Sequence, residues 1–328
     1  MCGIVAYLGH RQARPLLIEG LKRLEYRGYD SAGMAVLNGG MHVARAVGRV
    51  ANLESLVEAD TSFEGTLGIA HTRWATHGGV TEANAHPHRD DKSGIAIVHN
   101  GIIENYAALR TYLSERGHTF TSETDTEVLA MLIGELYDPE QGMTLQKAVQ
   151  AALREVTGAS AIAVVCGHDP ATLVCARKGS ALLVGVGSGE FVVASDPSAI
   201  VAHTTQAFPL DDYNVCTITR DTFTTSTIHN VPVTPRVEQL ELDLEQIELG
   251  GYAHFMQKEI FEQPAALRTC MRGRLDGAEG RVVLGGLRQL APQLVRARRI
   301  ILAAQGTALH SAMIGEYLFE DLAKIPTE

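Results

Sequence analysis

The second residue, Cys2, brings a thiol and a free α-amine into one residue if the initiator Met1 is removed. In unperturbed peptides the amine titrates near about 8 and the thiol near about 8.5, so the amine can take the thiol proton near neutral pH. Cys2 would then be a nucleophile that carries its own base. A cysteine beside an apolar run is also typical of a buried strand, so this chemistry needs an oxyanion hole and a substrate-binding group elsewhere in the sequence.

Asn100 and Gly101 could supply the oxyanion hole. They follow the apolar segment 95–98, where we expect a buried strand to end. A side-chain amide and a backbone N–H at that position can point the same way and stabilise the negative oxygen of a tetrahedral intermediate. An ordinary Asn-Gly turn is the alternative interpretation.

Arg73 and Asp125 could bind the charged groups of a free amino acid. The planar guanidinium of Arg73 offers two parallel donors to a carboxylate, and Asp125 can pair with an ammonium group. Each is also, on its own, typical of a solvated surface charge.

Five histidines fall between residues 71 and 99, which raises the question of a metal site; they are His71, His77, His86, His88 and His99. Their spacing fits no standard structural zinc pattern and no cysteine accompanies them, so we expect no metal. The five cysteines of the chain contain no Cys-x-x-Cys pair, and we expect neither disulfides nor a thiolate metal site.

The composition favours an ordinary globular protein of two domains. The chain has 328 residues, with 28 Lys and Arg against 38 Asp and Glu, and it has no basic stripe of the kind that follows a phosphate backbone. No apolar run approaches the roughly 20 residues that span a bilayer, and residues 1–15 do not resemble a signal peptide. We therefore expect a cytoplasmic protein that binds neither nucleic acid nor membrane.

The hydrophobic pattern predicts strands and helices that are segregated along the chain. Strands are expected at 3–8, 34–37, 42–46, 68–70, 95–98, 160–165, 171–176, 182–186, 190–194 and 215–219, and helices at 16–24, 103–115, 126–136 and 145–156. This order favours an α+β fold, in which sheets pack on each other and are covered by helices, over a parallel βαβ sheet.

The pattern becomes irregular at 231–252, which we interpret as a linker. Beyond it we expect helices at 255–274, interrupted at Pro264, and at 287–295, then a strand at 299–304, a turn at 305–307 and a helix at 309–322. One strand with its helix cannot close a doubly wound sheet, so 253–328 is expected to be an incomplete domain.

Six stretches of the sequence resemble the N-terminal nucleophile glutamine amidotransferases, and among them the glutamine–fructose-6-phosphate aminotransferase family. They are residues 2–5, 23–33, 71–78, 84–88, 98–105 and 122–127. The resemblance implies a four-layer αββα N-terminal nucleophile hydrolase sandwich over 1–230, a linker over 231–252, and the incomplete start of an α/β sugar isomerase domain over 253–328.

The resemblance also implies roles for individual residues. Cys2 is the nucleophile and its α-amine the base, while Asn100 and Gly101 form the oxyanion hole. Glutamine is bound by Arg73, Trp74, Thr76, His77 and Asp125, with Trp74 as a lid. Arg27 holds the N-terminus, although a helix-ending arginine in water is the plain alternative, and His86 orders the loop. No cofactor is implied.

The sugar half departs from the family pattern. The family has Cys-Gly-Thr-Ser where this chain has Gln305-Gly306-Thr307-Ala308. Of the turn that binds the sugar phosphate in the family, this chain therefore keeps only Gly306 and Thr307. We expect fructose 6-phosphate to be a partner only if another chain completes the isomerase domain, and exposed apolar surface to favour association such as a homodimer.

Two alternatives stay open. One is a free-standing glutaminase subunit that serves another acceptor, and the other is a non-catalytic glutamine-binding module. The second is disfavoured because a binding module needs no nucleophile.

Overall fold

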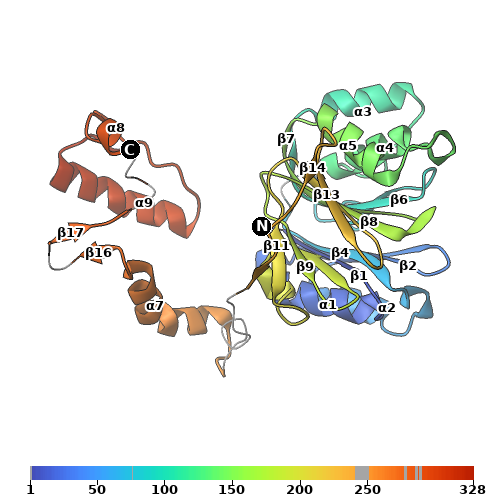
Figure 1. Cartoon of the computed structure of the whole chain (residues 1–328), viewed down its shortest axis with the longest axis horizontal. Coiled ribbons are helices and arrows are strands. Elements are labelled where there is room, and N and C mark those ends of the chain that lie inside the picture. Colours follow the sequence, from blue (N-terminus) through green and yellow to red (C-terminus); the bar gives the residue numbers. More distant parts are fainter. Residues whose placement is uncertain (1, 76, 241–250, 277–278, 285–286, 288–289) are drawn as a thin grey trace. The chain divides into compact units, whose positions relative to one another are not determined.

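The structure is a computed structural model of the 328-residue chain. It describes all residues except 1, 76, 241–250, 277–278, 285–286 and 288–289 (Figure 1). The chain divides into two units, residues 1–248 and 249–328. The predicted boundaries 1–230, 231–252 and 253–328 stay a prediction.

The first unit is built on two antiparallel sheets. Within the described residues one sheet has eight strands, in the order β15-β11-β9-β10-β1-β4-β2-β3. Their bounds are β1 (Gly3–Leu8), β2 (Ser31–Leu37), β3 (Met41–Val47), β4 (Leu67–Arg73), β9 (Leu183–Val186), β10 (Phe191–Ala194), β11 (Gln206–Pro209) and β15 (Glu238–Gln239).

The other sheet has seven strands in the described part of the chain, in the order β14-β13-β12-β8-β7-β6-β5. Their bounds are β5 (His88–Asp90), β6 (Ile95–Ile103), β7 (Gly158–Cys166), β8 (Asp169–Lys178), β12 (Asn214–Ile218), β13 (Phe223–Thr227) and β14 (Pro232–Val233). β14 and β15 lie in the segment that we interpreted as a linker, whose residues 241–250 fall outside the described residues.

Helices cover the outer face of each sheet (Figure 1). α1 (Ala13–Leu24) and α2 (Val50–Val57) lie on the eight-stranded sheet, and α3 (Tyr106–Glu115), α4 (Asp125–Leu136) and α5 (Leu145–Glu155) on the seven-stranded one. Strand alternation explains the layers, because Ile4 and Ala6 of β1 face the core between the sheets while Val5 and Tyr7 face α1. The predicted α+β sandwich of four layers, αββα, is confirmed.

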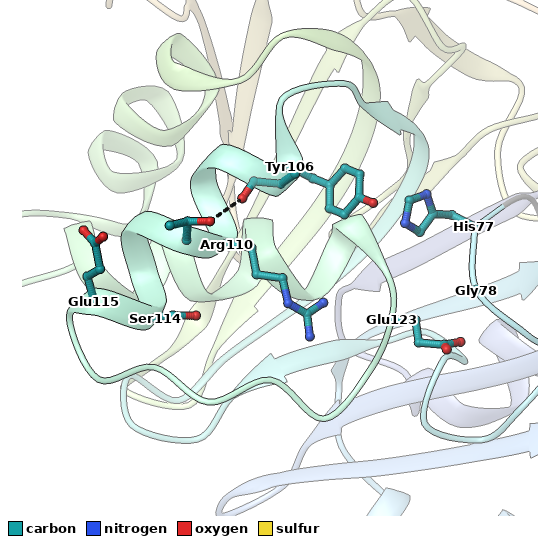
Figure 2. A pocket seen from close by; sticks show the side chains of 9 residues that line it. His77, Gly78, Tyr106, Arg110, Ser114, Glu115 and Glu123 are labelled. Atoms are coloured by element: carbon teal, nitrogen blue, oxygen red, sulfur yellow. Dashed lines mark hydrogen bonds between the residues drawn. The ribbon is translucent and has the colours of Figure 1, made fainter.

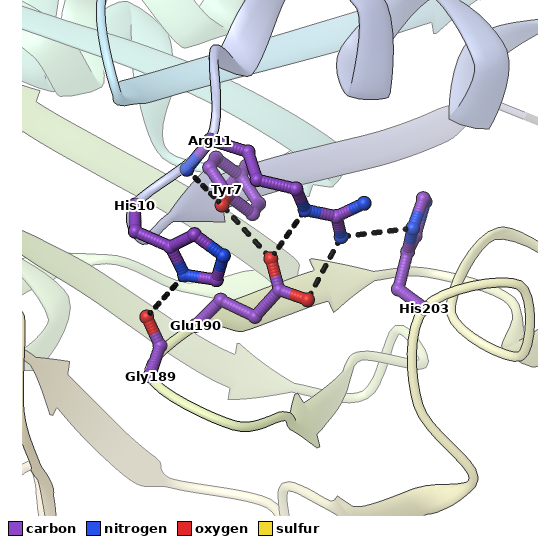
Figure 3. A network of polar contacts seen from close by, with 6 residues as sticks. All are labelled: Tyr7, His10, Arg11, Gly189, Glu190 and His203. Atoms are coloured by element: carbon purple, nitrogen blue, oxygen red, sulfur yellow. Dashed lines mark hydrogen bonds and ion pairs between the residues drawn. The ribbon is translucent and has the colours of Figure 1, made fainter.

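A network of hydrogen bonds lies at the C-terminal end of β1, opposite to the end at which Cys2 lies. The Glu190 carboxylate accepts hydrogen bonds from the Tyr7 hydroxyl (2.9 Å) and from Nε and Nη2 of Arg11 (2.8 Å each). Figure 3 shows these groups converging between the β1–α1 loop and the segment before β10. The network therefore joins the first two elements of the chain to a strand that follows almost two hundred residues later.

One predicted boundary is wrong. We placed the end of a strand at Val98 and the start of a helix at Ile103, whereas β6 runs to Ile103 and α3 begins at Tyr106. The strand continues through the Asn-Gly pair because Asn100 pairs with Ala161 and Gly101 with Ser160 across the β6–β7 ladder.

The second unit contains α7 (Phe255–Met271), which continues through Pro264, then β16 (Leu275–Asp276), β17 (Arg281–Val282), α8 (Ala291–Leu294) and α9 (Thr307–Leu318). α8 lies inside the helix predicted at 287–295, of which 288–289 are outside the described residues. The predicted strand at 299–304 is wrong, because Ile300 makes an isolated bridge to Thr327 and no neighbouring strand is described there. No hydrophobic side chain that the structure describes in this unit is buried.

Among the described residues, no helix has the length and apolar character needed to cross a membrane.

Candidate active site

Cys2 lies at the head of β1, between β10 and β4 in the middle of the eight-stranded sheet. Its Sγ accepts a hydrogen bond from the Trp74 N–H at 3.3 Å and faces the Trp74 carbonyl oxygen at 3.5 Å. Burial raises the pKa of the Cys2 thiol, and the Trp74 N–H and the charge of Arg73 offset this only in part. The thiol is therefore protonated at neutral pH, and a nucleophilic attack by sulfur requires a base.

Asn100 reaches Cys2 from the opposite sheet. Its Nδ2 donates to the Cys2 carbonyl oxygen at 3.2 Å, while its Oδ1 lies 3.0 Å from His71 Nε2. Gly101 follows with a φ of +144°, and a Cβ at that position would overlap the carbonyl oxygen of Ala159. The two strands thus bring the thiol and the Asn100 amide to the same end of the sandwich.

A small cavity lies beside Cys2. Its volume is 30 Å³, and its lining residues are Cys2, Arg73, Trp74, His77, His86, His99, Gly101, Thr124, Asp125 and Thr126. Most of the side chains predicted for the glutaminase site therefore line one space; Thr76 lies outside the described residues.

Arg73, at the end of β4, holds the loop that follows. Its guanidinium donates to the Gly79 carbonyl oxygen at 2.9 Å and to that of His77. The carboxylate of Glu123 accepts from the Gly79 N–H at 3.1 Å. The side chain of Trp74 is 42% exposed, and its ring meets that of Tyr29 edge-on, with centroids 5.5 Å apart. Loop carbonyl oxygens thus accept from the guanidinium that is predicted to bind the substrate carboxylate.

Asp125 is the first residue of α4, and Thr124 caps that helix by accepting from the Glu127 N–H. One carboxylate oxygen of Asp125 accepts from the Ile103 N–H at 2.8 Å. The side chain is buried at the cavity wall, where it could pair with an ammonium group.

Four of the predicted histidines form a buried cluster, and two of them, His86 and His99, line the cavity. His71 and His86 stack with centroids 4.1 Å apart, His88 meets His86 at 4.8 Å, and the His99 N–H donates to His86 Nδ1. Burial lowers the pKa of His71 to about 3 and those of His86 and His88 well below their usual range. These rings are neutral near pH 7. In the part of the chain that the structure describes, no three His, Cys, Asp or Glu side chains are grouped as metal ligands.

A wider cleft of 910 Å³ adjoins the small cavity, and His77 lines both (Figure 2). The His77 ring meets the ring of Tyr106 edge-on, with centroids 4.6 Å apart. The other lining residues that Figure 2 labels are Gly78, Arg110, Ser114, Glu115 and Glu123. The cleft gives solvent a route to the loop that covers Cys2.

Arg27, Gly306 and Thr307 are not among the residues that line the cavity. Arg27 donates to the Ser195 carbonyl oxygen at 3.2 Å and pairs with Asp196 at 3.0 Å, in the turn after β10, so it borders the strand next to β1. Its role at the N-terminus stays a prediction. In the second unit, Gly306 directly precedes α9 and Thr307 is the first residue of that helix.

Sequence reasoning assigned no role to three residues that support the site. Asp30 accepts a hydrogen bond from the Ala75 N–H at 2.9 Å and so anchors the loop after Trp74. His71 contacts Asn100, although the sequence suggested only its membership of a histidine-rich segment. Thr124 could have been found from the helix-capping pattern Thr-x-x-Glu at 124–127.

Known proteins resemble this chain throughout its length. A family model described as "Glutamine amidotransferase domain" matches residues 71–202. A glutamine–fructose-6-phosphate aminotransferase (isomerizing) from Chlorobaculum tepidum is 52% identical over 330 residues, which cover 100% of this chain and 54% of that protein. A protein of the same name from Bacteroides thetaiotaomicron is 47% identical over 331 residues, which cover 100% of this chain and 54% of that protein. The chain thus spans about half the length of the curated relatives it matches.

Solved structures agree with this fold. A structure described as the allosteric regulatory enzyme of purine biosynthesis matches with a TM-score of 0.60 and 25% identity, over 69% of this chain and 49% of that one. The glutamine phosphoribosylpyrophosphate amidotransferase of B. subtilis matches with a TM-score of 0.61 and 20% identity, over 100% of this chain and 65% of that one. The second likeness concerns the fold alone.

Proposed function

We propose that this chain, which belongs to the glutamine amidotransferases, hydrolyses the side-chain amide of glutamine through Cys2, after removal of Met1. The observation that carries the proposal is the meeting of the Cys2 backbone and the Asn100 amide, 3.2 Å apart, beside the cavity that Cys2 and Gly101 line. A nucleophile and a fixed hydrogen-bond donor from opposite sheets are the parts that acyl transfer needs.

The reaction begins when the α-amine of Cys2 takes the thiol proton and Sγ bonds to the amide carbon of glutamine. The carbonyl oxygen becomes negative and receives hydrogen bonds from the Asn100 NH2 group and the Gly101 N–H. The C–N bond then breaks, and the amide nitrogen leaves as ammonia with the proton held by the amine. Water attacks the resulting thioester and releases glutamate and the Cys2 thiol.

Free glutamine is the substrate that the surrounding charges favour. Arg73 would bind the α-carboxylate once the loop at 77–79 releases its guanidinium, and Asp125 would bind the α-ammonium group. Thr76 and His77 would add contacts from the loop, Trp74 would cover the bound amino acid, and His86 would support the loop from below. Both charged groups of the substrate would then be paired, which burial of an amino acid requires.

The test is glutamate release from glutamine by the 328-residue chain, with intact mass measured on the same sample. We expect the mass to lack Met1, and we expect Cys2→Ala to reduce hydrolysis to background. Cys166→Ala, which removes a buried thiol in β7 remote from the cavity, is the matched control and should remain active. Activity in a sample that retains Met1 would contradict the α-amine as base.

We propose further that the ammonia serves the synthesis of glucosamine 6-phosphate from fructose 6-phosphate, in the cytoplasm. The support is similarity over the whole chain to relatives named for that reaction, which also disfavours both alternatives. Gly306 and Thr307 at the start of α9 would contribute to the sugar-phosphate site, and pairing of two copies as a homodimer belongs to the same proposal.

A further inference from the structure

From the contacts of Asn100, we infer that His71 is a positioning residue, which holds the Asn100 amide so that its NH2 group and not its carbonyl oxygen faces the backbone of Cys2. The inference rests on the proposed function, because it concerns the oxyanion hole of that reaction. His71 touches neither the cavity nor the thiol, and it would act only through Asn100.

The chemistry of the partners fixes the orientation of both side chains. The Cys2 carbonyl oxygen can only accept a hydrogen bond, so the Asn100 group at 3.2 Å from it is the NH2 group. The Asn100 carbonyl oxygen then faces His71 Nε2 at 3.0 Å. The carbonyl oxygen of His99, also only an acceptor, lies 3.1 Å from the same nitrogen. His71 Nε2 must therefore carry the proton.

Packing keeps the His71 ring in this state. The side chain is 1% exposed and stacks on His86 with an interplanar angle of 14°. His71 Nδ1 is buried and has no hydrogen-bond partner among the described residues, so the tautomer with its proton on Nδ1 would leave that N–H without an acceptor and two carbonyl oxygens without a donor. His86 is itself fixed, because its Nδ1 accepts from the His99 N–H at 3.2 Å.

Loss of the His71 donor would free the Asn100 amide to rotate. Its carbonyl oxygen could then turn toward the cavity and repel the developing oxyanion. Removal of one oxyanion-hole donor typically lowers kcat by about 10²–10³-fold. Sulfur nucleophilicity would be unaffected, because the thiol contacts Trp74 and not His71.

Four variants of the full chain test this inference: H71L, H71Q, N100A and H71L/N100A. We expect H71L to lose about 10²–10³-fold in kcat, with a much smaller change in KM. H71Q can place an N–H near the lost Nε2 and should recover at least tenfold over H71L. In the N100A background, H71L should change kcat by less than about threefold, because a residue that acts through Asn100 has nothing left to position.

Alkylation of Cys2 by iodoacetamide and thermal unfolding are measured on every variant. An unchanged alkylation rate in H71L shows that the nucleophile and its surroundings are intact. The inference is overturned if H71L keeps more than half of the wild-type kcat, if H71L costs as much in N100A as in the wild type, or if H71Q is no better than H71L.

Nitrogen-15 NMR of histidine-labelled chain gives a readout that does not depend on activity. We expect His71, assigned by its absence in H71Q, to show a protonated Nε2 and an unprotonated Nδ1 at pH 7. The opposite tautomer would overturn the inference. A wild-type chain that shows the expected tautomer but hydrolyses no glutamine would contradict the proposed function while leaving the orientation of Asn100 supported.

Discussion

Gly101 is a residue of the site at which the structure does not accommodate any side chain. Its φ of +144° is strained for any side chain, and the Ala159 carbonyl oxygen occupies the space of a Cβ. The glycine lets β6 continue past Asn100 while the chain beside the cavity stays free of a side chain. Position 101 is thus constrained by backbone conformation and by packing at once.

We predict that Gly101→Ala abolishes glutamine hydrolysis and lowers the free energy of unfolding by about 1–3 kcal/mol or more. Gly39→Ala is the matched control, because Gly39 has a φ of +66° and no atom within 4 Å of its would-be Cβ. It should cost about 1 kcal/mol and keep full activity. Denaturant unfolding measures the change in stability, and a glutaminase assay measures the change in activity. An active Gly101→Ala variant would contradict the role of Gly101 in the proposed oxyanion hole.

The buried histidines predict acid sensitivity. The His71 pKa falls from 6.5 to about 3 on burial, so the unfolded chain binds the proton more tightly. The stability that His71 contributes is present above pH 6.5 and is lost as pH falls from there toward 3. At pH 5 the loss is about 2 kcal/mol from this residue alone.

Urea unfolding of the wild type and of H71Q at pH 7 and pH 5 measures this loss. The drop in unfolding free energy between the two pH values should be smaller in H71Q by about 2 kcal/mol. Equal drops would show that His71 is not the group that takes up the proton.

The sequence predicted the residues expected to react with or bind the substrate better than it predicted the residues that hold them in place. Cys2, Arg73 and Asp125 lie in short motifs, whereas the role of His71 depends on a contact between β4 and β6 that no local pattern encodes. The sequence also could not reveal that the Arg73 guanidinium donates hydrogen bonds to carbonyl oxygens of the loop that follows β4.

At the scale of elements, segments with a clear hydrophobic pattern were predicted well whatever their length. β1, α1 and α5 match the expectation, as do the four-residue strands β9 and β10, while α2 and β13 were not predicted. The boundary error at 98–103 arose because an Asn-Gly pair normally ends a strand. Pairing with β7 overrides that local preference.

The Arg11–Glu190 network gives an element-scale prediction. Glu190→Gln should lower the free energy of unfolding by about 1–3 kcal/mol, since Tyr7 and Arg11 lose a charged acceptor; the partial exposure of Arg11, at 41%, limits the effect. Glu54→Gln, which breaks the exposed pair with Lys22, is the control and should change stability by less than about 0.5 kcal/mol. Equal effects in thermal or urea unfolding would contradict a stabilising role for the network.

At the scale of the whole molecule, the two units differ in how far they are packed. The first has buried cores on both sides of each sheet, whereas the described part of 249–328 has no buried hydrophobic side chain. We predict that the 328-residue chain releases ammonia from glutamine but forms no glucosamine 6-phosphate from fructose 6-phosphate.

Product analysis of the chain incubated with both substrates tests this prediction. Addition of a polypeptide that carries the remaining isomerase sequence of a relative is the positive control. Amino sugar made by the chain alone would contradict our interpretation of its C-terminal unit.

The short segment from Pro232 to Gln239 has a practical consequence. It pairs first with β13, at the edge of one sheet, and then with β11, at the edge of the other. A recombinant fragment stopped at residue 230 would uncover the stretches of β13 and β11 that now pair with β14 and β15, and unpaired strand edges are templates for intermolecular β-pairing. Fragments meant for crystallisation or inhibitor screening should therefore extend past Gln239, or they will tend to aggregate although every catalytic group is present.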